Sequence, residues 1–342
     1  MGKFIPLAFF HGVFCVVGGI SAGVGLLFSY IFVGSAFTRY SILIAAIATV
    51  NSCFLICHIA SNLIMFAGHG DLLSLGQKEK IFPNLRPCPR IEPDLCIDHP
   101  IVIKSAVTYK SLEFSYNKEN NYYLYLSPVV NGGSTIVFLH GNGVPACCFA
   151  SFIELIHEFH PVANIAAIEY RGYGKRSREN ASVYDLKGMR ADVSKAWRDI
   201  ATKVNPDSMI IAGLSLGGGF AWSTIDILYP APKQLVLINT FADLGAMLRN
   251  ESEYYYPIIS LFMPTAITKY RLGEFHSSWK GSVLCVYTQN DSMFPPMHKD
   301  AFKIHFKDTK GCDWQEFMCP NGDHNGGPVF HQQWLKLLKV GK

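Results

Sequence analysis

The chain has 342 residues, of which 49% are hydrophobic and 16% charged, and its formal net charge is +4. This length is enough for one large domain and an additional segment, and the small, dispersed positive charge argues against nucleic acid as a partner. Its 10 cysteines form no C-x-x-C pair and no Cys/His cluster at zinc-finger spacing, so the sequence predicts no metal site.

Much of the hydrophobicity lies in two uncharged segments near the N-terminus, at about residues 4–33 and 42–68. A helix of roughly 20 apolar residues crosses the hydrocarbon core of a bilayer, and a backbone in lipid must satisfy its own hydrogen bonds. The connection around Arg39 is short, so residues 1–70 are expected to form a two-helix transmembrane hairpin. More Lys and Arg residues follow the hairpin than lie in its turn, and the positive-inside rule then places the rest of the chain in the cytosol.

Other interpretations of this region remain open. A cleaved signal peptide would account for the first apolar segment but not for the second. Asn51, His58 and Asn62 make the second segment less apolar, so it could instead lie partly at the membrane interface.

The composition changes over residues 71–100, which are rich in Pro, Asp, Lys and Arg. Prolines at this density interrupt both helices and central strands. The sequence therefore predicts a linker here, followed by a globular domain over residues 101–342.

Short apolar strands alternate with helical segments through this domain. An opening antiparallel pair is expected at residues 101–110 and 122–127. Further strands are expected at 134–140, 163–170, 208–213, 234–239, 282–288 and 313–318, and helices at 149–159, 181–204, after Ser215 up to Leu228, and at 329–340. Continuous runs of Val, Ile and Leu are typical of strands covered on both faces, so the fold class is α/β, with a mostly parallel sheet flanked by helices.

The clearest chemical signal is Gly213-Leu214-Ser215-Leu216-Gly217, which matches G-x-S-x-G. It lies between a predicted buried strand and a predicted helix, the context in which this motif presents a nucleophilic serine on a sharp turn. Larger side chains two positions to either side of the serine would collide across that turn. An isolated match could equally be an ordinary glycine-rich turn, so other loops must decide.

The loop His140-Gly141-Asn142-Gly143 supports the interpretation of Ser215 as a nucleophile. It follows an earlier strand of the parallel series. The backbone N–H groups of Asn142 and Leu216 would there stabilise the oxyanion of a tetrahedral intermediate.

Two further loops supply an acid and a base. Asp291 follows the predicted strand 282–288, and His324 lies in the polar loop after the last predicted strand. Serine, aspartate and histidine in this chain order form one known arrangement of the catalytic triad.

From about residue 100 to its end, the chain resembles the α/β-hydrolase superfamily of serine hydrolases, in its esterase/lipase-like and peptidase-like branches. The resemblance rests on the G-x-S-x-G motif, on the H-G-N loop at His140 and on Arg171-Gly172-Tyr173-Gly174, which looks like an R-G-x-G loop. With its two apolar N-terminal segments, the chain also resembles a chlamydia-type family of membrane-anchored hydrolase-like proteins, which would imply a pathogen-vacuole (inclusion) membrane. Glu169 stands where the superfamily often has Asp, a difference that concerns the packing of the R-G-x-G loop.

The chemistry of the three side chains assigns their roles. A serine hydroxyl is a weak nucleophile at neutral pH and needs an adjacent base. His324 would accept the proton of Ser215 and pass it to the leaving group, while Asp291 would hold the imidazole tautomer. Water would then resolve the acyl-enzyme, and no metal or organic cofactor is implied.

Other residues compete for these roles. Asp243 follows the predicted strand 234–239, at a position that some relatives use for the acid. Asp323 adjoins His324 and fits the cap of a turn better than a triad acid. His140 is expected to shape the oxyanion loop and not to act as a base.

Residues 241–280 lie between two core strands, where the superfamily inserts a cap. Their apolar side chains favour a lipid-like acyl group, although a helix that covers the core would explain them equally well. We therefore expect a membrane-anchored serine hydrolase that cleaves lipid-like carboxylic esters or thioesters, and the sequence leaves its protein partners unknown. The alternatives are a serine peptidase or amidase, and a hydrolase-fold membrane effector or scaffold that binds partners and would need neither Ser215 nor His324.

Overall fold

The computed structural model describes residues 101–104, 111–142, 145–176, 179, 186–244, 272, 278–291, 293–295, 297–324 and 326–341. The chain divides into two compact units, and all of these residues belong to the unit formed by residues 86–247 and 269–342. The predicted hairpin, the predicted linker and most of the predicted cap lie outside the described residues. Within them, no helix is both long enough and apolar enough to cross a membrane.

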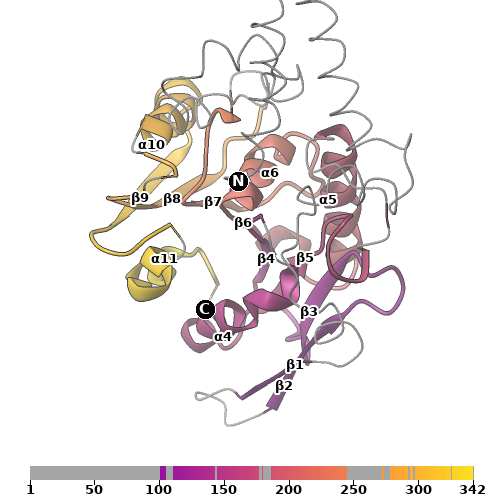
Figure 1. The fold of residues 1–342 in the computed structure, drawn as a ribbon. Coiled ribbons are helices and arrows are strands. Elements are labelled where there is room, and N and C mark those ends of the chain that lie inside the picture. Colours follow the sequence, from indigo (N-terminus) through magenta and orange to yellow (C-terminus); the bar gives the residue numbers. More distant parts are fainter. Residues whose placement is uncertain are drawn as a thin grey trace, which may run out of the picture. The chain divides into compact units, whose positions relative to one another are not determined.

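One nine-stranded sheet forms the centre of the described unit, in the spatial order β1-β2-β3-β5-β4-β6-β7-β8-β9 (Figure 1). The first three strands pair antiparallel with their neighbours, and the other six run parallel to one another. The strands are β1 (Ile101–Lys104), β2 (Ser111–Tyr116), β3 (Tyr123–Ser127), β4 (Thr135–Leu139), β5 (Asn164–Ile168), β6 (Met209–Leu214), β7 (Gln234–Ile238), β8 (Ser282–Thr288) and β9 (Asp313–Cys319).

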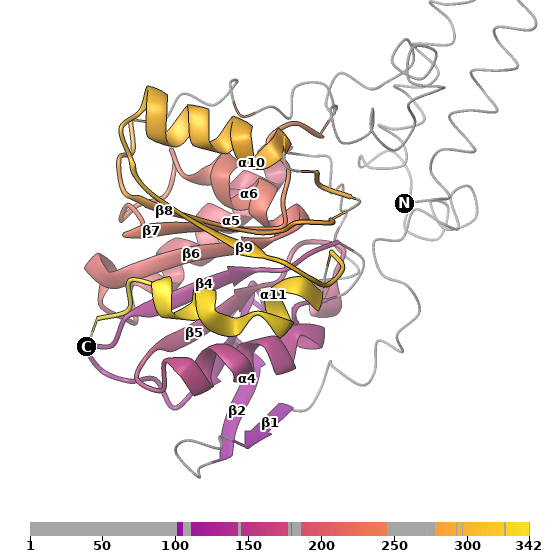
Figure 2. The ribbon, with the colours of Figure 1, turned by 90° about the vertical axis from the view of Figure 1, so that its left-hand side faces the viewer.

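Helices cover both faces of this sheet, as Figure 2 shows in a view along its edge. One face carries α4 (Ala150–Phe159) and α11 (Gly326–Phe330), and the other carries α5 (Leu186–Ala201), α6 (Leu216–Thr224) and α10 (Met297–Phe302). Every residue of β4, β5, β6 and β7 is buried. Two-sided burial explains the continuous apolar runs in these strands, and the predicted α/β fold with a mostly parallel sheet is confirmed.

The opening of the domain differs from the prediction. The segment expected to form one strand over residues 101–110 contains the short β1, and the unpredicted β2 pairs with both β1 and β3. In β2 the side chains of Leu112, Phe114 and Tyr116 are buried and alternate with more exposed ones. This alternation of period two is the pattern of a strand that is buried on one face, and it is less conspicuous than the apolar runs of the central strands.

The end of the domain also differs. The single helix expected over residues 329–340 is divided into α11 and a 3₁₀-helix, Gln332–Leu337, because His331 adopts a non-helical backbone conformation. Trp334 is fully buried, stacks on Phe152 of α4 and donates its indole N–H to the carbonyl of Pro328. Packing of this side chain therefore overrides the helical pattern.

A further helical segment was not predicted. It comprises α10 and the π-helix Lys303–Thr309, which follow β8 and lead to β9. Pro295 and Pro296 precede it, and their presence favours a loop when the sequence is considered alone.

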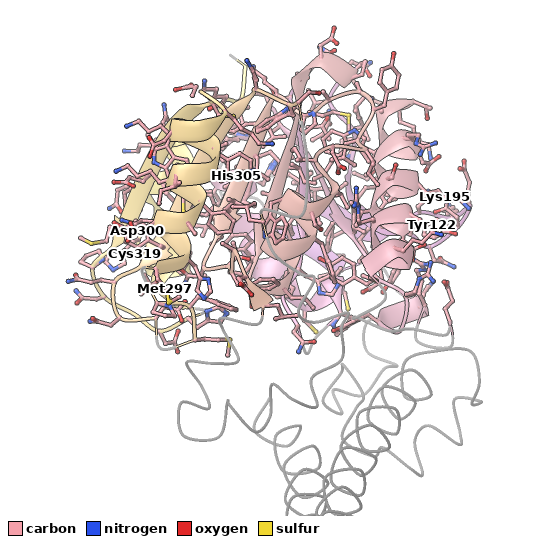
Figure 3. All side chains as sticks on the ribbon, turned by 90° about the horizontal axis from the view of Figure 1, so that it is seen from above. Tyr122, Lys195, Met297, Asp300, His305 and Cys319 are labelled. Carbon is pink, nitrogen blue, oxygen red and sulfur yellow. The ribbon has the colours of Figure 1, made fainter. Side chains whose placement is uncertain are left out.

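The loop that follows β5 is tied to α5 by charged side chains. Arg171 and Arg176 both pair with Asp192 of α5, at 2.7 and 2.8 Å. The Arg176 guanidinium also lies 4.2 Å from the ring centroid of Tyr122, whose hydroxyl accepts a hydrogen bond from Lys195 of α5 (Figure 3). These contacts fix the loop that supports the candidate site.

Candidate active site

The carboxyl ends of the central strands meet at one edge of the sheet. In the register, Leu139 of β4 pairs with Gly213 of β6, and Leu214 of β6 pairs with Ile238 of β7. The loops that follow these strands are therefore neighbours. In open α/β sheets this edge is where ligands bind.

Ser215 occupies the turn between β6 and α6 and has a strained backbone. Its φ is 55° and its ψ is −120°, a conformation that costs on the order of 1–3 kcal/mol for a residue with a side chain. Its N–H donates to the carbonyl of Ile238 at 2.9 Å, and its own carbonyl accepts from the hydroxyl of Thr240 at 2.6 Å. Neighbouring strand ends thus hold the turn that carries the predicted nucleophile.

The two glycines of the motif are required by close backbone contacts. A Cβ atom on Gly213 would collide with the carbonyl of Gly217, and one on Gly217 would collide with the carbonyl of Leu139. The collision predicted across the turn is confirmed, and the turn also packs directly against the end of β4.

His324 and Asp291 form a hydrogen-bonded pair. The Nδ1 atom of His324 lies 2.7 Å from Oδ2 of Asp291. Since an ionised carboxylate can only accept, Nδ1 is the donor in this pair. Within the described part of the chain, Nε2 of His324 has no hydrogen-bond partner and is buried.

The other carboxylate oxygen of Asp291 is held by the backbone. Oδ1 accepts the N–H groups of Met293 and Phe294, at 2.9 and 3.0 Å. The ring of Phe294 also packs on the imidazole of His324, with centroids 4.9 Å apart. Asp291 is 4% exposed, so burial and three hydrogen bonds fix its orientation toward His324.

The two competing acids are placed differently. Oδ1 of Asp323 accepts the N–H of Gly326 at the start of α11. This contact caps the turn, the role that the sequence favoured for Asp323. Asp243 acts on His298: burial lowers the pKa of that imidazole, and the charge of Asp243 partly opposes this shift. The His324 ring bonds to Asp291.

The predicted oxyanion loop lies beside Ser215. A Cβ atom built on Gly141 would be 3.4 Å from the Cβ atom of Ser215. Asn142 follows Gly141 in an exposed turn, and Leu216 is the first residue of α6. The structure thus places the loops that carry both predicted oxyanion donors next to the serine.

Glu169 contacts one residue before and one residue after the predicted oxyanion loop segment around Asn142. Its buried carboxylate lies 3.3 Å from Nε2 of His140 and accepts the N–H of Ala146 at 3.2 Å. It also accepts the hydroxyl proton of Tyr116 at 2.6 Å. Burial, reinforced by the Glu169 charge, raises the pKa of Tyr116, so this phenol remains a neutral donor.

Two tyrosines of the R-G-x-G region complete the support of this loop. The hydroxyl of Tyr170 donates to the carbonyl of His140 at 3.0 Å, and that of Tyr173 donates to Oδ1 of Asn142 at 2.7 Å. Both tyrosines are fully buried. His140 is therefore part of the framework of the loop, as expected from the sequence.

Sequence reasoning missed Asn239 and Thr240, which follow β7. Thr240 bonds to Ser215, and the carboxamide of Asn239 bonds to Thr288 and to the carbonyl of His324. Two small polar residues directly after the apolar run of β7 were the available signal, because this edge of the sheet collects functional side chains.

A second buried histidine interacts electrostatically with Asp291. His298 of α10 is 2% exposed, and its Nδ1 accepts the N–H of Ala242 at 3.3 Å. Burial lowers its pKa to about 4, although the charges of Asp243 and Asp291 oppose this shift. The imidazole is therefore neutral at physiological pH. It borders a cavity, also lined by Asn239 and Phe294, that has room for about one water molecule.

Metal-ligating residues do not gather in the described part of the chain, which contains no group of three or more His, Cys, Asp or Glu side chains able to hold an ion.

Comparisons with known proteins identify the family. The model of the Alpha/beta hydrolase family matches residues 136–308, about half of the chain. The chain therefore belongs to the α/β hydrolase family. A comparison with curated proteins gave no match.

Several solved structures are similar at low sequence identity. Francisella virulence factor BioJ matches with 14% identity and a TM-score of 0.49, over 78% of this chain and 92% of that one. The esterase of the archaeon Pyrobaculum calidifontis matches with 15% identity and a TM-score of 0.48, over 84% and 92%. Dipeptidyl peptidase 4 of Porphyromonas gingivalis matches with 14% identity and a TM-score of 0.47, over 70% of this chain and 35% of the peptidase.

Proposed function

We propose that the chain is a membrane-anchored serine hydrolase that cleaves carboxylic esters or thioesters of lipid-like molecules. The observation that carries this proposal is the 2.7 Å hydrogen bond between His324 and the buried Asp291, at the strand edge where Ser215 occupies a strained turn. Membership in the α/β hydrolase family supports it.

In the proposed mechanism, Nε2 of His324 accepts the hydroxyl proton of Ser215 as its oxygen attacks the substrate carbonyl. Asp291 holds Nδ1–H and stabilises the imidazolium that forms. The N–H groups of Leu216 and Asn142 stabilise the oxyanion of the tetrahedral intermediate, where each donor is worth about 10²–10³ in rate. Collapse of the tetrahedral intermediate gives acyl-Ser215 and the leaving group, which takes its proton from His324. Water activated by His324 then hydrolyses the acyl-enzyme and releases the carboxylic acid.

The lipid-like acyl group and the membrane are the sequence-based parts of the proposal. The apolar side chains of residues 241–280 favour an acyl group, and the segments at residues 4–33 and 42–68 favour an anchor. With the same segments, the resemblance to the chlamydia-type family suggests a pathogen-vacuole membrane, with the catalytic domain in the cytosol.

A matched substrate series tests the reaction and the substrate class together. The full-length protein in detergent is assayed with p-nitrophenyl esters of increasing acyl length, and with thioesters and anilides of the same acids. We expect esters and thioesters of longer acyl chains to be cleaved fastest. The variant Ser215→Ala should lose about 10³-fold or more of this activity, whereas Ser223→Ala in α6 should keep it.

Faster cleavage of the anilides would favour a peptidase or amidase. Absence of all hydrolysis by a folded wild type would contradict the enzyme proposal and favour the binding-protein alternative.

A further inference from the structure

We propose that Asn239 is a positioning residue that fixes the His324 loop relative to Ser215 and Asp291. Asn239 directly follows β7, is 3% exposed and has a positive φ of 39°. This proposal rests on the proposed function only for its kinetic consequence, because the contacts themselves belong to the fold.

The carboxamide of Asn239 bonds to two other loops at once. Its Nδ2 atom donates to the carbonyl of His324 at 2.6 Å and to the hydroxyl oxygen of Thr288 at 2.9 Å. Its Oδ1 atom accepts the N–H of Thr288 at 2.8 Å. One buried side chain thus joins the end of β7 to the end of β8 and to the loop that carries the histidine.

The residues on either side of Asn239 bond to the nucleophile turn. The carbonyl of Ile238 accepts the N–H of Ser215, and the hydroxyl of Thr240 donates to the carbonyl of Ser215. Residues 238–240 therefore contact the backbone of Ser215 on one side and the backbone of His324 on the other.

The same segment reaches the acid through β8. Thr288, which makes two hydrogen bonds with Asn239, accepts the N–H of Asp291 on its carbonyl at 3.2 Å. All three proposed triad residues are consequently connected to residues 238–240 by one or two hydrogen bonds.

Few side chains can replace Asn at this position. The position needs a donor and an acceptor on one short side chain, together with a left-handed backbone, which Asn adopts more readily than most residues. Asp lacks the donor for the His324 carbonyl, and Ala lacks both groups. Since a displacement of about 1 Å in a catalytic group can cost 10²-fold in rate, loss of the Asn239 donor should slow the reaction.

Two substitutions separate the effects of the side chain. Asn239→Gly tolerates the positive φ and removes the carboxamide, whereas Asn239→Asp keeps an acceptor for Thr288 and removes the donor. Asn164 provides the matched control at the opposite end of the strands. It is 6% exposed, begins β5, and binds both the N–H and the carbonyl of Val130 through its carboxamide, at 2.6 and 2.9 Å.

Each variant is measured in the full-length protein by two readouts. The first is the second-order rate of labelling by a fluorophosphonate probe, divided by the folded fraction. The second is the low-field proton resonance of the hydrogen bond between His324 Nδ1 and Asp291, assigned by its loss in His324→Ala, which requires no enzymatic activity.

We expect both Asn239 variants to label about 10- to 100-fold more slowly than wild type and to shift or lose the low-field resonance. The corresponding Asn164→Gly and Asn164→Asp variants should keep the resonance and label within about twofold of wild type. An unchanged resonance in both Asn239 variants, or equal losses in the Asn164 variants, would overturn the role of Asn239. A folded wild type that shows no labelling would contradict the proposed function, and the resonance would still decide the role of Asn239.

Discussion

Glu169 is a fully buried acidic side chain behind the predicted oxyanion loop. Its carboxylate spans the oxyanion loop from His140 to Ala146, and Tyr116 donates to it from β2. Because a buried carboxylate without partners is costly, these contacts are what allow an acidic side chain in the core. The loop that carries Asn142 is therefore held from behind by β2 and by the residues after β5.

Tyr173→Phe should weaken the oxyanion loop without disturbing its packing. The change removes only the hydroxyl that donates to Oδ1 of Asn142 at 2.7 Å. A hydrogen bond of this kind is worth about 1 kcal/mol, so fluorophosphonate labelling should slow by up to about tenfold. The control Tyr123→Phe removes a hydroxyl that donates to Asp199 and should leave the labelling rate unchanged. Equal rates for the two variants would contradict a role for Tyr173 at the oxyanion loop.

Burial of His298 should lower the free energy of unfolding in acid. In the unfolded chain this histidine binds a proton near its ordinary pKa of 6.5, whereas burial lowers the pKa in the folded protein to about 4. The unfolded state therefore binds more protons between these values, and the free energy of unfolding should fall by on the order of 3 kcal/mol from pH 7 to pH 4. Urea unfolding of wild type and His298→Asn as a function of pH measures this contribution. The same pH dependence in both proteins would show that His298 is not the source.

At the scale of elements, the strand–turn–helix unit of β6, Ser215 and α6 depends on close backbone packing. Gly217→Ala would place a methyl group against the carbonyl of Leu139, which should cost about 1–3 kcal/mol of stability and displace Ser215. We expect a lower thermal midpoint and loss of probe labelling. Gly341→Ala is the control, because its methyl group would meet only the Ser134 hydroxyl at an ordinary 3.5 Å. A fully active, stable Gly217→Ala protein would contradict this account of the turn.

The central parallel strands could be predicted from sequence because their burial is uniform. The parallel strands β4, β6 and β7 are entirely buried, so their apolar runs identify them directly. The half-buried β2 was missed because its alternating pattern is less conspicuous than an apolar run. The divided C-terminal helix was missed because its form depends on a partner distant in sequence. That partner is the α4 surface, on which Trp334 packs.

The candidate site could be predicted only in part, for a similar reason. Ser215, Asp291 and His324 follow strands in a recognisable order, and their types identify their chemistry. Asn239 and Tyr173 act through hydrogen bonds to other loops, which become visible only when the strand order brings those loops together.

For the whole molecule, the proposed anchor would keep the catalytic domain beside its lipid-like substrate. Two apolar segments of this length insert stably in a bilayer. The full-length protein should therefore remain in the membrane fraction after extraction with alkaline carbonate. Release into the soluble fraction would contradict the hairpin prediction.

The central claim is that Ser215 is a nucleophile activated by the hydrogen-bonded pair of His324 and Asp291. Labelling by a fluorophosphonate probe, followed by peptide mapping of the modified residue, tests this claim most directly. We expect the modification on Ser215, in wild type and in the control Ser223→Ala, and its loss in Ser215→Ala and His324→Ala. Labelling that persists in Ser215→Ala, or a folded wild type that is not labelled, would contradict the account.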